Sequence, residues 1–230
     1  MEPFMATTQK GNLNSQAFET LRRDIISCRL KPGTTITEAW LTKHYAFGKA
    51  AIRHALARLT QQGLTINQGR LGYTVTPITI KSIRESYQIR RLVEPELCRM
   101  AAVKLDAEIL TALRTCSEET YDRHNENAMI SLSYANHRFH CLIATAAGNE
   151  RLTRLIEELS DDHMRIAYVS MVYGQSDKEW SDDHANIVAA LEAGKGEVAA
   201  QLMAEHLAQS EETIMRAVLN LPELLKTSLS

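Results

Sequence analysis

The sequence predicts a mainly α-helical protein of two domains, a small N-terminal domain of helices with one hairpin and a C-terminal all-helical bundle of about six helices. Apolar residues recur at helical spacing along most of the 230 residues, and short β-type runs occur only between Gly63 and Pro77. Charge also divides the chain. Residues 1–80 contain ten basic and four acidic side chains, a net charge of +6, whereas residues 81–230 contain 16 basic and 24 acidic ones, a net charge of −8. The basic first third predicts a domain that binds a polyanion.

Composition narrows the class of protein. With 44% apolar and 23% charged residues, the chain is that of an ordinary globular protein. No run approaches the roughly 20 apolar residues that cross a bilayer, and the polar N-terminus has no signal-peptide core. Cys28, Cys98, Cys116 and Cys141 show no CxxC spacing and are expected to be reduced thiols. We therefore expect a cytoplasmic protein that makes no membrane contact.

The N-terminal domain is expected over residues 15–77, after a tail of residues 1–14. Its first helix is predicted from Ser15 to Cys28, and Thr37 is placed to cap a second helix whose buried side would include Trp40 and Leu41. A third helix is predicted from Lys49 to Gln62, after the turn at Gly48. Ile52, Leu56 and Leu59 would form its inward face.

Two short β-type runs, residues 64–66 and 73–75, enclose a basic turn over residues 67–72. Two helices joined by a tight turn and followed by a hairpin form a winged helix-turn-helix, in which the third helix enters the major groove of DNA. The wing would place Arg70 against the neighbouring backbone or minor groove. The predicted DNA-binding residues are Lys49, Arg53, His54, Arg58, Gln68, Arg70 and Gly72.

The segment LKPGTTITEAWLTKHYAFGKAAIRHALARLTQQGLTINQGRLGYTV resembles the N-terminal domain of GntR-family transcription regulators. Three departures from the family pattern concern DNA recognition. Residues 48–51 read Gly-Lys-Ala-Ala where the family usually has Ser-Arg-Thr-Pro, His54 stands where Glu is common, and residues 38–40 lack the usual Arg. Lys49 keeps a positive charge but lacks the bidentate fork that reads guanine, so we expect DNA binding with an altered operator.

The C-terminal domain is expected over residues 78–221, followed by a tail of residues 222–230. Helical periodicity continues to the end of this domain, and Gly148 and the Gly194–Gly196 segment are clear helix stops. The expected helices cover residues 78–103, 107–125, 128–147, 149–172, 179–193 and 196–220.

Histidines mark a candidate site in this bundle. His184 and His206 lie 22 residues apart with the glycine turn midway, so an antiparallel helical hairpin brings them level. Asn136 and His140 are four residues apart and share one helical face. Three imidazoles and one amide oxygen suit a divalent transition metal, zinc first, with nickel, manganese or iron as alternatives. The competing interpretation is that each histidine packs independently. His163 and His137 do not fit the set, because a continuous hairpin leaves His163 out of level with His140 and His137 points to another face.

A second resemblance covers most of residues 80–215. The segments YQIRRLVEPELCRMAA, NHRFHCLIATAAGNERL and DDHANIVAALEAGKGEVAAQLMAEHL are similar to the effector domain of the FadR subfamily of GntR regulators, called FCD. The resemblance implies a metal held by an acidic residue and three histidines, with a small carboxylate effector docked on it. The matching positions are Asn136, His140, His184 and His206. Asn136 replaces the usual Asp, and a neutral amide oxygen is a weaker ligand.

Arg90 matches the family's Arg in an Arg-x-x-x-Glu pattern that ends at Glu94. It could pair with an effector carboxylate or form a structural ion pair with Glu94, and the sequence leaves both open.

These observations predict a transcription regulator, a repressor that binds a double-stranded DNA operator as a homodimer under the control of a small carboxylate. A metal-dependent hydrolase built on the three histidines is the alternative from another class. No HExxH motif is present, and Asp183 and Glu205 are expected to face away from the histidines, so no enzyme activity is predicted. The other alternative is a metal-free regulator that binds an apolar ligand.

Overall fold

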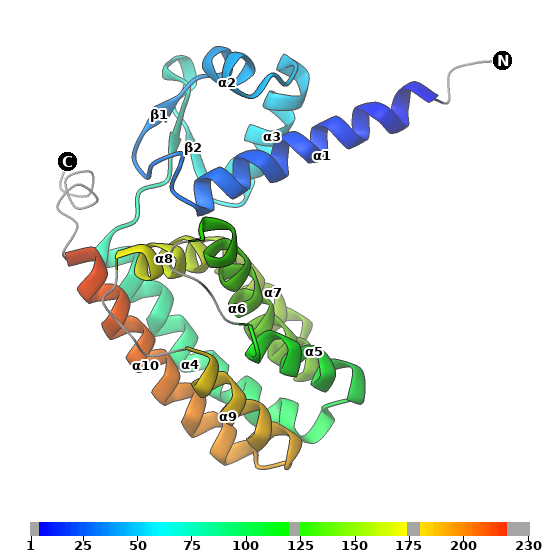
Figure 1. The fold of residues 1–230 in the computed structure, drawn as a ribbon, viewed down its shortest axis with the longest axis vertical. Coiled ribbons are helices and arrows are strands. Elements are labelled where there is room, and N and C mark those ends of the chain that lie inside the picture. The colour runs from blue at the N-terminus through cyan, green and yellow to red at the C-terminus, as the bar shows by residue number, and fades with distance from the viewer. Residues whose placement is uncertain (1–4, 120–124, 174–179, 220–230) are drawn as a thin grey trace. The chain divides into compact units, whose positions relative to one another are not determined.

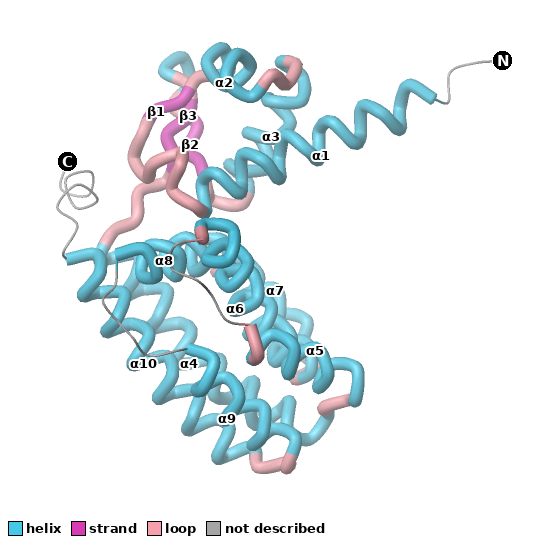
Figure 2. The backbone as a smooth tube through the Cα atoms, in the orientation of Figure 1, coloured by secondary structure: helices cyan, strands magenta, loops and turns pink. Residues whose placement is uncertain are grey.

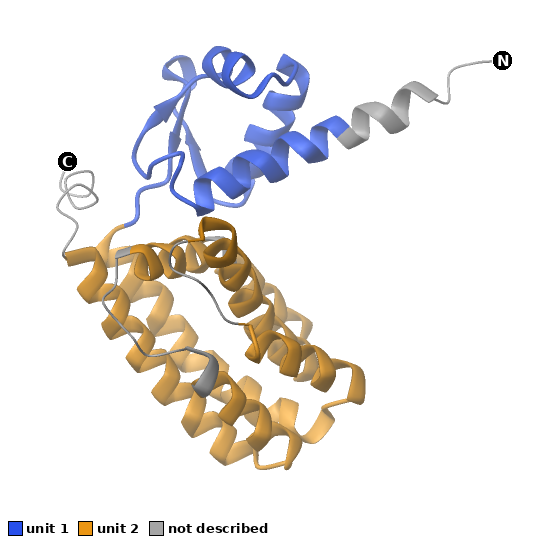
Figure 3. Ribbon diagram, viewed as in Figure 1, with its two compact units in different colours: residues 1–78, 226–230 blue, residues 79–225 orange. Residues whose placement is uncertain are grey.

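The computed structural model describes residues 5–119, 125–173 and 180–219. Its internal contacts divide the chain into two compact units, with the boundary between Ile78 and Thr79 (Figure 3). This is the division into a basic and an acidic part that the charge distribution indicates. The fold is mainly helical, with one small sheet in the first unit (Figure 2).

The first unit has the order of elements of a winged helix-turn-helix. Its elements are α1 (Met5–Ile26), β1 (Thr35–Ile36), α2 (Glu38–Tyr45), α3 (Lys49–Gln61), β2 (Thr65–Asn67), a 3-10 turn (Gly69–Leu71) and β3 (Tyr73–Val75). The strands form an antiparallel sheet in the order β1-β3-β2, with Ile66 opposite Thr74 and Thr35 opposite Thr74 on the other side. The hairpin of β2 and β3 is the predicted wing.

Three details of this unit differ from the sequence-based prediction. Helix α1 begins at Met5, so most of the expected tail over residues 1–14 is helical. Strand β1 was not predicted, because two residues are too few to show a β pattern. Trp40 was expected to be buried beside Leu41, yet 45% of Trp40 is exposed and Leu41 alone is buried. The ring of Trp40 stacks on that of His44 one turn later, 4.5 Å between centroids, and so remains on the surface of α2.

The core of the first unit lies between α1, α3 and the sheet. Ile52, Leu56 and Leu59 are fully buried, which confirms the predicted inward face of α3. Thr37 caps α2 as predicted, because its side-chain oxygen accepts a hydrogen bond from the amide of Trp40 at 3.2 Å.

The second unit is the all-helical bundle. Its helices are α4 (Ile80–Lys104), α5 (Ala107–Ser117), α6 (Glu126–Ala146), α7 (Glu150–Glu158), α8 (Ser160–Tyr173), α9 (Trp180–Glu192) and α10 (Gly196–Leu219). Helix α4 lies along α10 over much of its length (Figure 1), and the hydroxyls of Tyr87 and Ser210 share a hydrogen bond of 2.9 Å between the two. Both predicted glycine stops are present, with φ of +69° at Gly148 and +66° at Gly194.

The bundle differs from the prediction at two places. Helix α5 ends at Ser117, whereas a helix to residue 125 was expected; residues 120–124 lie outside the described part. The single helix expected over residues 149–172 is two helices, which meet at Leu159. No glycine or proline marks this break.

In the part of the chain that the structure describes, no helix combines the length and apolar character needed to cross a bilayer. None of the four cysteines is part of a disulfide in the described residues.

Candidate functional site

The outward face of α3 carries three of the predicted DNA-binding residues. Lys49, Arg53 and His54 are exposed on the side opposite the buried Ile52 and Leu56. Lys49 is the first residue of α3, so its charge lies at the end of the helix where amide groups are free of intrahelical partners. This arrangement suits an approach to phosphates and base edges.

Two arginines of α3 are engaged within the domain. Nε of Arg53 donates to Oε2 of Glu38 at 2.7 Å, so an acidic residue of α2 partly neutralises a cation on the outward face of α3. The guanidinium of Arg58 lies over the ring of Phe18, 3.6 Å from its centroid, and is half-buried. Arg58 therefore joins α3 to α1 by a cation–π contact, a structural role that the sequence pattern did not reveal.

The wing presents Gln68 and Arg70 to solvent. Gly72 has another role, because its φ is +99° and an added Cβ would lie 2.5 Å from the carbonyl oxygen of Ile36. Any side chain at position 72 would push β1 away from β3. Gly72 thus shapes the wing, whereas Gln68 and Arg70 are available to contact DNA.

Three of the predicted metal ligands lie together inside the bundle. His140 comes from α6, His184 from α9 and His206 from α10, and each offers a ring nitrogen within 4.8 Å of the other two. All three side chains are buried. The Nε2 atoms of His184 and His206 are 3.3 Å apart. Two ligand nitrogens of a tetrahedral zinc site lie about 3.3 Å apart when each Zn–N bond is about 2.0–2.1 Å.

Carboxylates lie near the Nδ1 atoms of two of these imidazoles. Nδ1 of His140 donates to Oε2 of Glu94 at 2.6 Å, so Nε2 carries the lone pair, and that buried Nε2 has no hydrogen-bond partner. Oδ2 of Asp183 lies 3.6 Å from Nδ1 of His206. The prediction that Asp183 faces away was wrong. In histidines that bind a metal through one ring nitrogen, a carboxylate typically lies beside the other ring nitrogen.

Burial favours the neutral form of His140 and of His184, and the neutral imidazole is the form that binds metal. Burial lowers the pKa of His140 to about 4, with Glu94 opposing the shift and Arg90 adding to it. Burial and the neighbouring His206 also hold the pKa of His184 well below its ordinary value. The ring of His184 is stacked on Phe139, 4.0 Å between centroids, which restricts its orientation. The donor set and its protonation therefore fit a transition metal.

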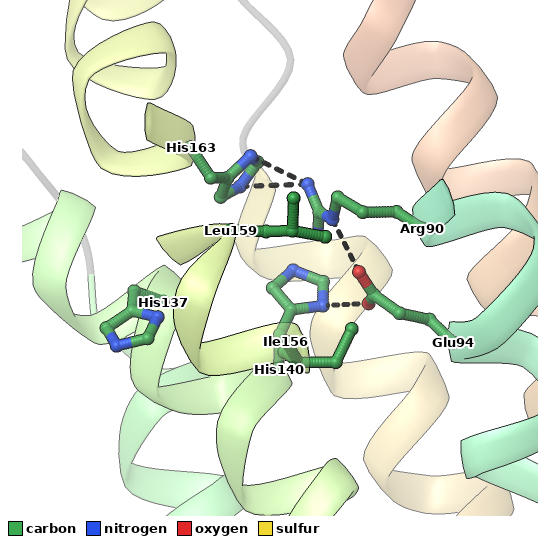
Figure 4. A pocket seen from close by; sticks show the side chains of 7 residues that line it. All are labelled: Arg90, Glu94, His137, His140, Ile156, Leu159 and His163. Carbon is green, nitrogen blue, oxygen red and sulfur yellow. Dashed lines mark hydrogen bonds and ion pairs between the residues drawn. The ribbon is translucent and has the colours of Figure 1, made fainter. Parts of the chain in front are cut away.

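Arg90 and Glu94 of α4 adjoin the cluster (Figure 4). Nε of Arg90 donates to Oε1 of Glu94 at 2.5 Å, which is the structural ion pair considered from the sequence. Burial disfavours ionisation of Glu94, but the charge of Arg90 and the hydrogen bonds from Arg90 and His140 outweigh it and hold the pKa of Glu94 below its usual range. Nη2 of Arg90 is nevertheless buried without a partner. The pair leaves one donor for an anion, so both roles of Arg90 are compatible.

His163 is not part of the three-histidine cluster, but it adjoins the site through contacts that the sequence did not predict. Its Nδ1 is 2.7 Å from Nη1 of Arg90, and its Nε2 is 2.9 Å from Nδ2 of Asn136. The prediction assumed one straight helix over residues 149–172. The break at Leu159 redirects α8 and brings His163 against α4 and α6, which no spacing rule for a hairpin could show. His137, in contrast, lies apart from these contacts in Figure 4, with its ring near Sγ of Cys141.

A cavity adjoins this constellation. It is lined by Arg90, Glu94, His137, His140, Ile156, Leu159 and His163 (Figure 4). Its volume of about 10 Å³ is room for roughly one water molecule. A larger ligand must displace side chains to enter.

Two segments of the chain match known protein families. Residues 85–209 match the FCD domain family, and residues 13–75 match the bacterial regulatory proteins of the gntR family. The chain belongs to the GntR family. Its FCD domain fits the FadR subfamily, as the sequence resemblance implies.

Relatives agree with this assignment. The chain is 31% identical to the HTH-type transcriptional regulator YdhC of Bacillus subtilis over 64% of its own length and 66% of the relative's. It is 24% identical to the HTH-type transcriptional repressor RspR of Escherichia coli over 88% and 89% of the two lengths. A solved GntR regulator from Rhodococcus sp. RHA1 shares the fold, with a TM-score of 0.72 and 21% identity over 88% of this chain and 97% of that one. The protein is a DNA-binding transcription regulator and not an enzyme.

The Glu38–Arg53 ion pair is expected to limit the DNA affinity of this GntR regulator. Glu38→Gln is expected to strengthen DNA binding roughly threefold, because it removes a negative charge beside the reading helix and releases Arg53. Fluorescence anisotropy on labelled DNA at two salt concentrations measures the change. Glu150→Gln, an exposed change in the FCD domain, should have no effect. Unchanged or weaker binding of the Glu38 variant would contradict the prediction.

The buried histidines of the FCD domain predict a dependence of stability on pH. Because the folded-state pKa of His140 is about 4 against 6.5 for the free side chain, the unfolded chain takes up the proton first as pH falls. Stability present above pH 6.5 is therefore lost as the pH falls toward 4. Between pH 7.5 and pH 5, His140 alone is expected to cost about 2 kcal/mol, or roughly 4–8 °C in Tm.

Calorimetry of the chelator-treated protein at the two pH values measures this loss. The exposed His54 supplies the control, since His54→Ala should leave the decrease intact. A Tm that does not fall between pH 7.5 and pH 5 would show that these histidines are not held neutral.

Proposed function

We propose that a small carboxylate, bound at a metal centre in the FCD domain, controls the operator affinity of this regulator. The observation that carries the proposal is a set of buried polar atoms without partners. Nη2 of Arg90 and Nε2 of His140 belong to one constellation, and a buried polar group left unpaired costs about 1–3 kcal/mol. A metal and an anion would supply partners for such atoms.

The metal is assigned to His140, His184 and His206, with zinc as the first candidate because of the nitrogen spacing. A bound divalent cation supplies positive charge that attracts an anion. Asn136 is the position that the family pattern offers as the fourth ligand. Arg90 is placed to pair with a carboxylate through its unpartnered Nη2, while Glu94 holds its guanidinium in place.

The alternative of a metal-free regulator with an apolar ligand fits less well. The adjoining cavity has room for roughly one water and is lined by two charged and three imidazole side chains. Such a lining disfavours an apolar ligand.

Control of DNA binding requires coupling between the two units. Helix α4 begins two residues after the boundary at Ile78 and carries both Arg90 and Glu94, so it is the element through which an effector could act on the first unit. We assign DNA contacts to Lys49, Arg53 and His54 of α3 and to Gln68 and Arg70 of the wing. A homodimer would place two such units on the half-sites of an operator, and repression is the mode proposed for it.

The test is fluorescence anisotropy on DNA fragments that flank the gene of this protein, with scrambled DNA as reference. Preference for one fragment by about a hundredfold establishes a specific operator. The measurement is then repeated with the chelated protein, with Zn²⁺, and with Zn²⁺ plus each member of a panel of small carboxylates. At least one carboxylate should change operator affinity by about 5–150-fold. Operator affinity that is the same under all these conditions would overturn the proposed control.

A further inference from the structure

His163 lies between two hydrogen-bond donors. Nη1 of Arg90 is 2.7 Å from its Nδ1 and 3.1 Å from its Nε2, and Nδ2 of Asn136 is 2.9 Å from its Nε2. All three side chains are buried. A neutral imidazole has one N–H donor and one acceptor nitrogen, so it cannot accept from both neighbours through different nitrogens.

Arg90 decides which nitrogen accepts. Its guanidinium carries hydrogens at every nitrogen and can only donate, so Nδ1 of His163 at 2.7 Å must be the acceptor. An Nδ1–H tautomer would direct one N–H against another at that distance. Nε2 of His163 therefore bears the hydrogen, and this N–H group needs an acceptor.

The acceptor available at that position is the amide of Asn136. The oxygen and nitrogen of an Asn amide exchange places by rotation of half a turn about the side-chain bond, with almost no change in shape. With Nδ2 toward His163, two donors meet and the buried Oδ1 has no partner. With Oδ1 toward His163, the oxygen accepts from Nε2–H and this conflict disappears.

We propose that His163 is a positioning residue that holds the Asn136 oxygen on its own Nε2–H, so that Asn136 is not a metal ligand and the centre has three protein ligands, His140, His184 and His206. This inference rests on the metal site of the proposed function. It departs from the ligand role that the family pattern suggests for position 136. An amide nitrogen is not a competent metal ligand, because its lone pair is delocalised into the carbonyl group.

The amide NH₂ group of Asn136 then takes the buried position of Oδ1, where it can donate hydrogen bonds. It lies near the guanidinium of Arg90, since Nη1 of Arg90 and the Asn136 amide are both within 3.1 Å of the same His163 nitrogen. Arg90 contributes a second donor, Nη2, which is buried without a partner. The chain would thus offer an anion two donors and a metal with one open position, in place of a metal with four protein ligands.

The first experiment needs no metal. Two-dimensional long-range ¹H–¹⁵N NMR of the chelator-treated protein identifies the tautomer of each histidine, and the loss of one set of signals in His163→Phe assigns His163. The Nε2–H tautomer is expected for His163. The Nδ1–H tautomer would overturn the inference.

The second experiment measures Zn²⁺ affinity by competition with a chromophoric chelator. Asn136→Ala should bind Zn²⁺ within tenfold of the unaltered protein, whereas His140→Ala should bind at least about a hundredfold more weakly. Circular dichroism confirms that each variant is folded, and Asn136→Ser replaces Asn136→Ala if that variant is not. A loss of tenfold or more on removing the Asn136 amide would overturn the inference.

A gain-of-ligand variant completes the test. In Asn136→Asp one carboxylate oxygen can accept from His163 while the other reaches a metal, so Zn²⁺ affinity should rise at least about tenfold. A rise below tenfold would count against the inference, because it would mean that Asn136 already supplies an oxygen. Failure of the unaltered protein to bind Zn²⁺ would overturn the metal site of the proposed function, and the His163 tautomer would still decide the orientation of Asn136.

Discussion

His184→Ala is expected to weaken Zn²⁺ binding by roughly a hundredfold or more. The Nε2 atoms of His184 and His206 are 3.3 Å apart, which is the separation of two nitrogens bound to one tetrahedral metal. Loss of either imidazole would therefore remove one metal ligand. The unaltered protein should gain about 2.7 kcal/mol of stability when free Zn²⁺ is 100 times Kd, and the variant should gain almost none at the same concentration.

Chelator competition and thermal unfolding with and without Zn²⁺ provide the two measurements. His137→Ala is the matched control, because His137 lies on the same helix as His140 but outside the cluster. His206→Gln tests the second ligand without removing the side chain's bulk, in case loss of the stacking on Phe139 destabilises His184→Ala. Normal Zn²⁺ affinity in both ligand variants would show that the three histidines do not form a metal centre.

Arg53→Ala is expected to weaken operator binding by about 5–150-fold, the cost of one good base contact. Arg53 is exposed on the outward face of α3, and its partner Glu38 is itself partly exposed, so DNA can compete for the guanidinium. Loss of a base contact should reduce binding to the operator more than binding to scrambled DNA. Arg53→Lys should recover only part of the loss, because an ammonium cannot make the bidentate contact.

Anisotropy titrations on operator and scrambled DNA over a range of salt concentrations measure both quantities. Lys195→Ala removes an exposed cation from the FCD domain and should leave DNA affinity unchanged. An equal loss on both DNAs, with a shallower salt dependence, would place Arg53 on a phosphate and contradict the base contact. No loss on either DNA would remove Arg53 from the interface.

Local patterns in the sequence predicted the parts of the site that depend on one element or one turn. The inward face of α3 follows from helical spacing, and the buried Ile52, Leu56 and Leu59 confirm it. The His184–His206 pair follows from counting residues on both sides of the glycine turn, because the rise per residue of a helix is constant. The family resemblance added His140 to this pair, and in the structure the three histidines have ring nitrogens within 4.8 Å of one another.

Interactions between distant segments escaped these patterns. The contacts of His163 were not predicted, because they depend on the break at Leu159 between α7 and α8, and no glycine or proline marks that break in the sequence. Asp183 was predicted to face away from the histidines because only its position around its own helix was considered. That position does not show how far its side chain reaches toward His206 on the neighbouring helix.

What the sequence by itself determined is the family, the two domains and the residue types of both candidate sites, because periodicity, turns and motif spacing are local properties of a chain. What only the tertiary structure decided is which polar atoms share hydrogens. The pairs Glu94–His140, Glu38–Arg53 and Arg90–His163 join separate helices. The physical reason is that a hydrogen bond tolerates a change of only a few tenths of an ångström in the distance between donor and acceptor. Helix packing across the whole domain sets those distances.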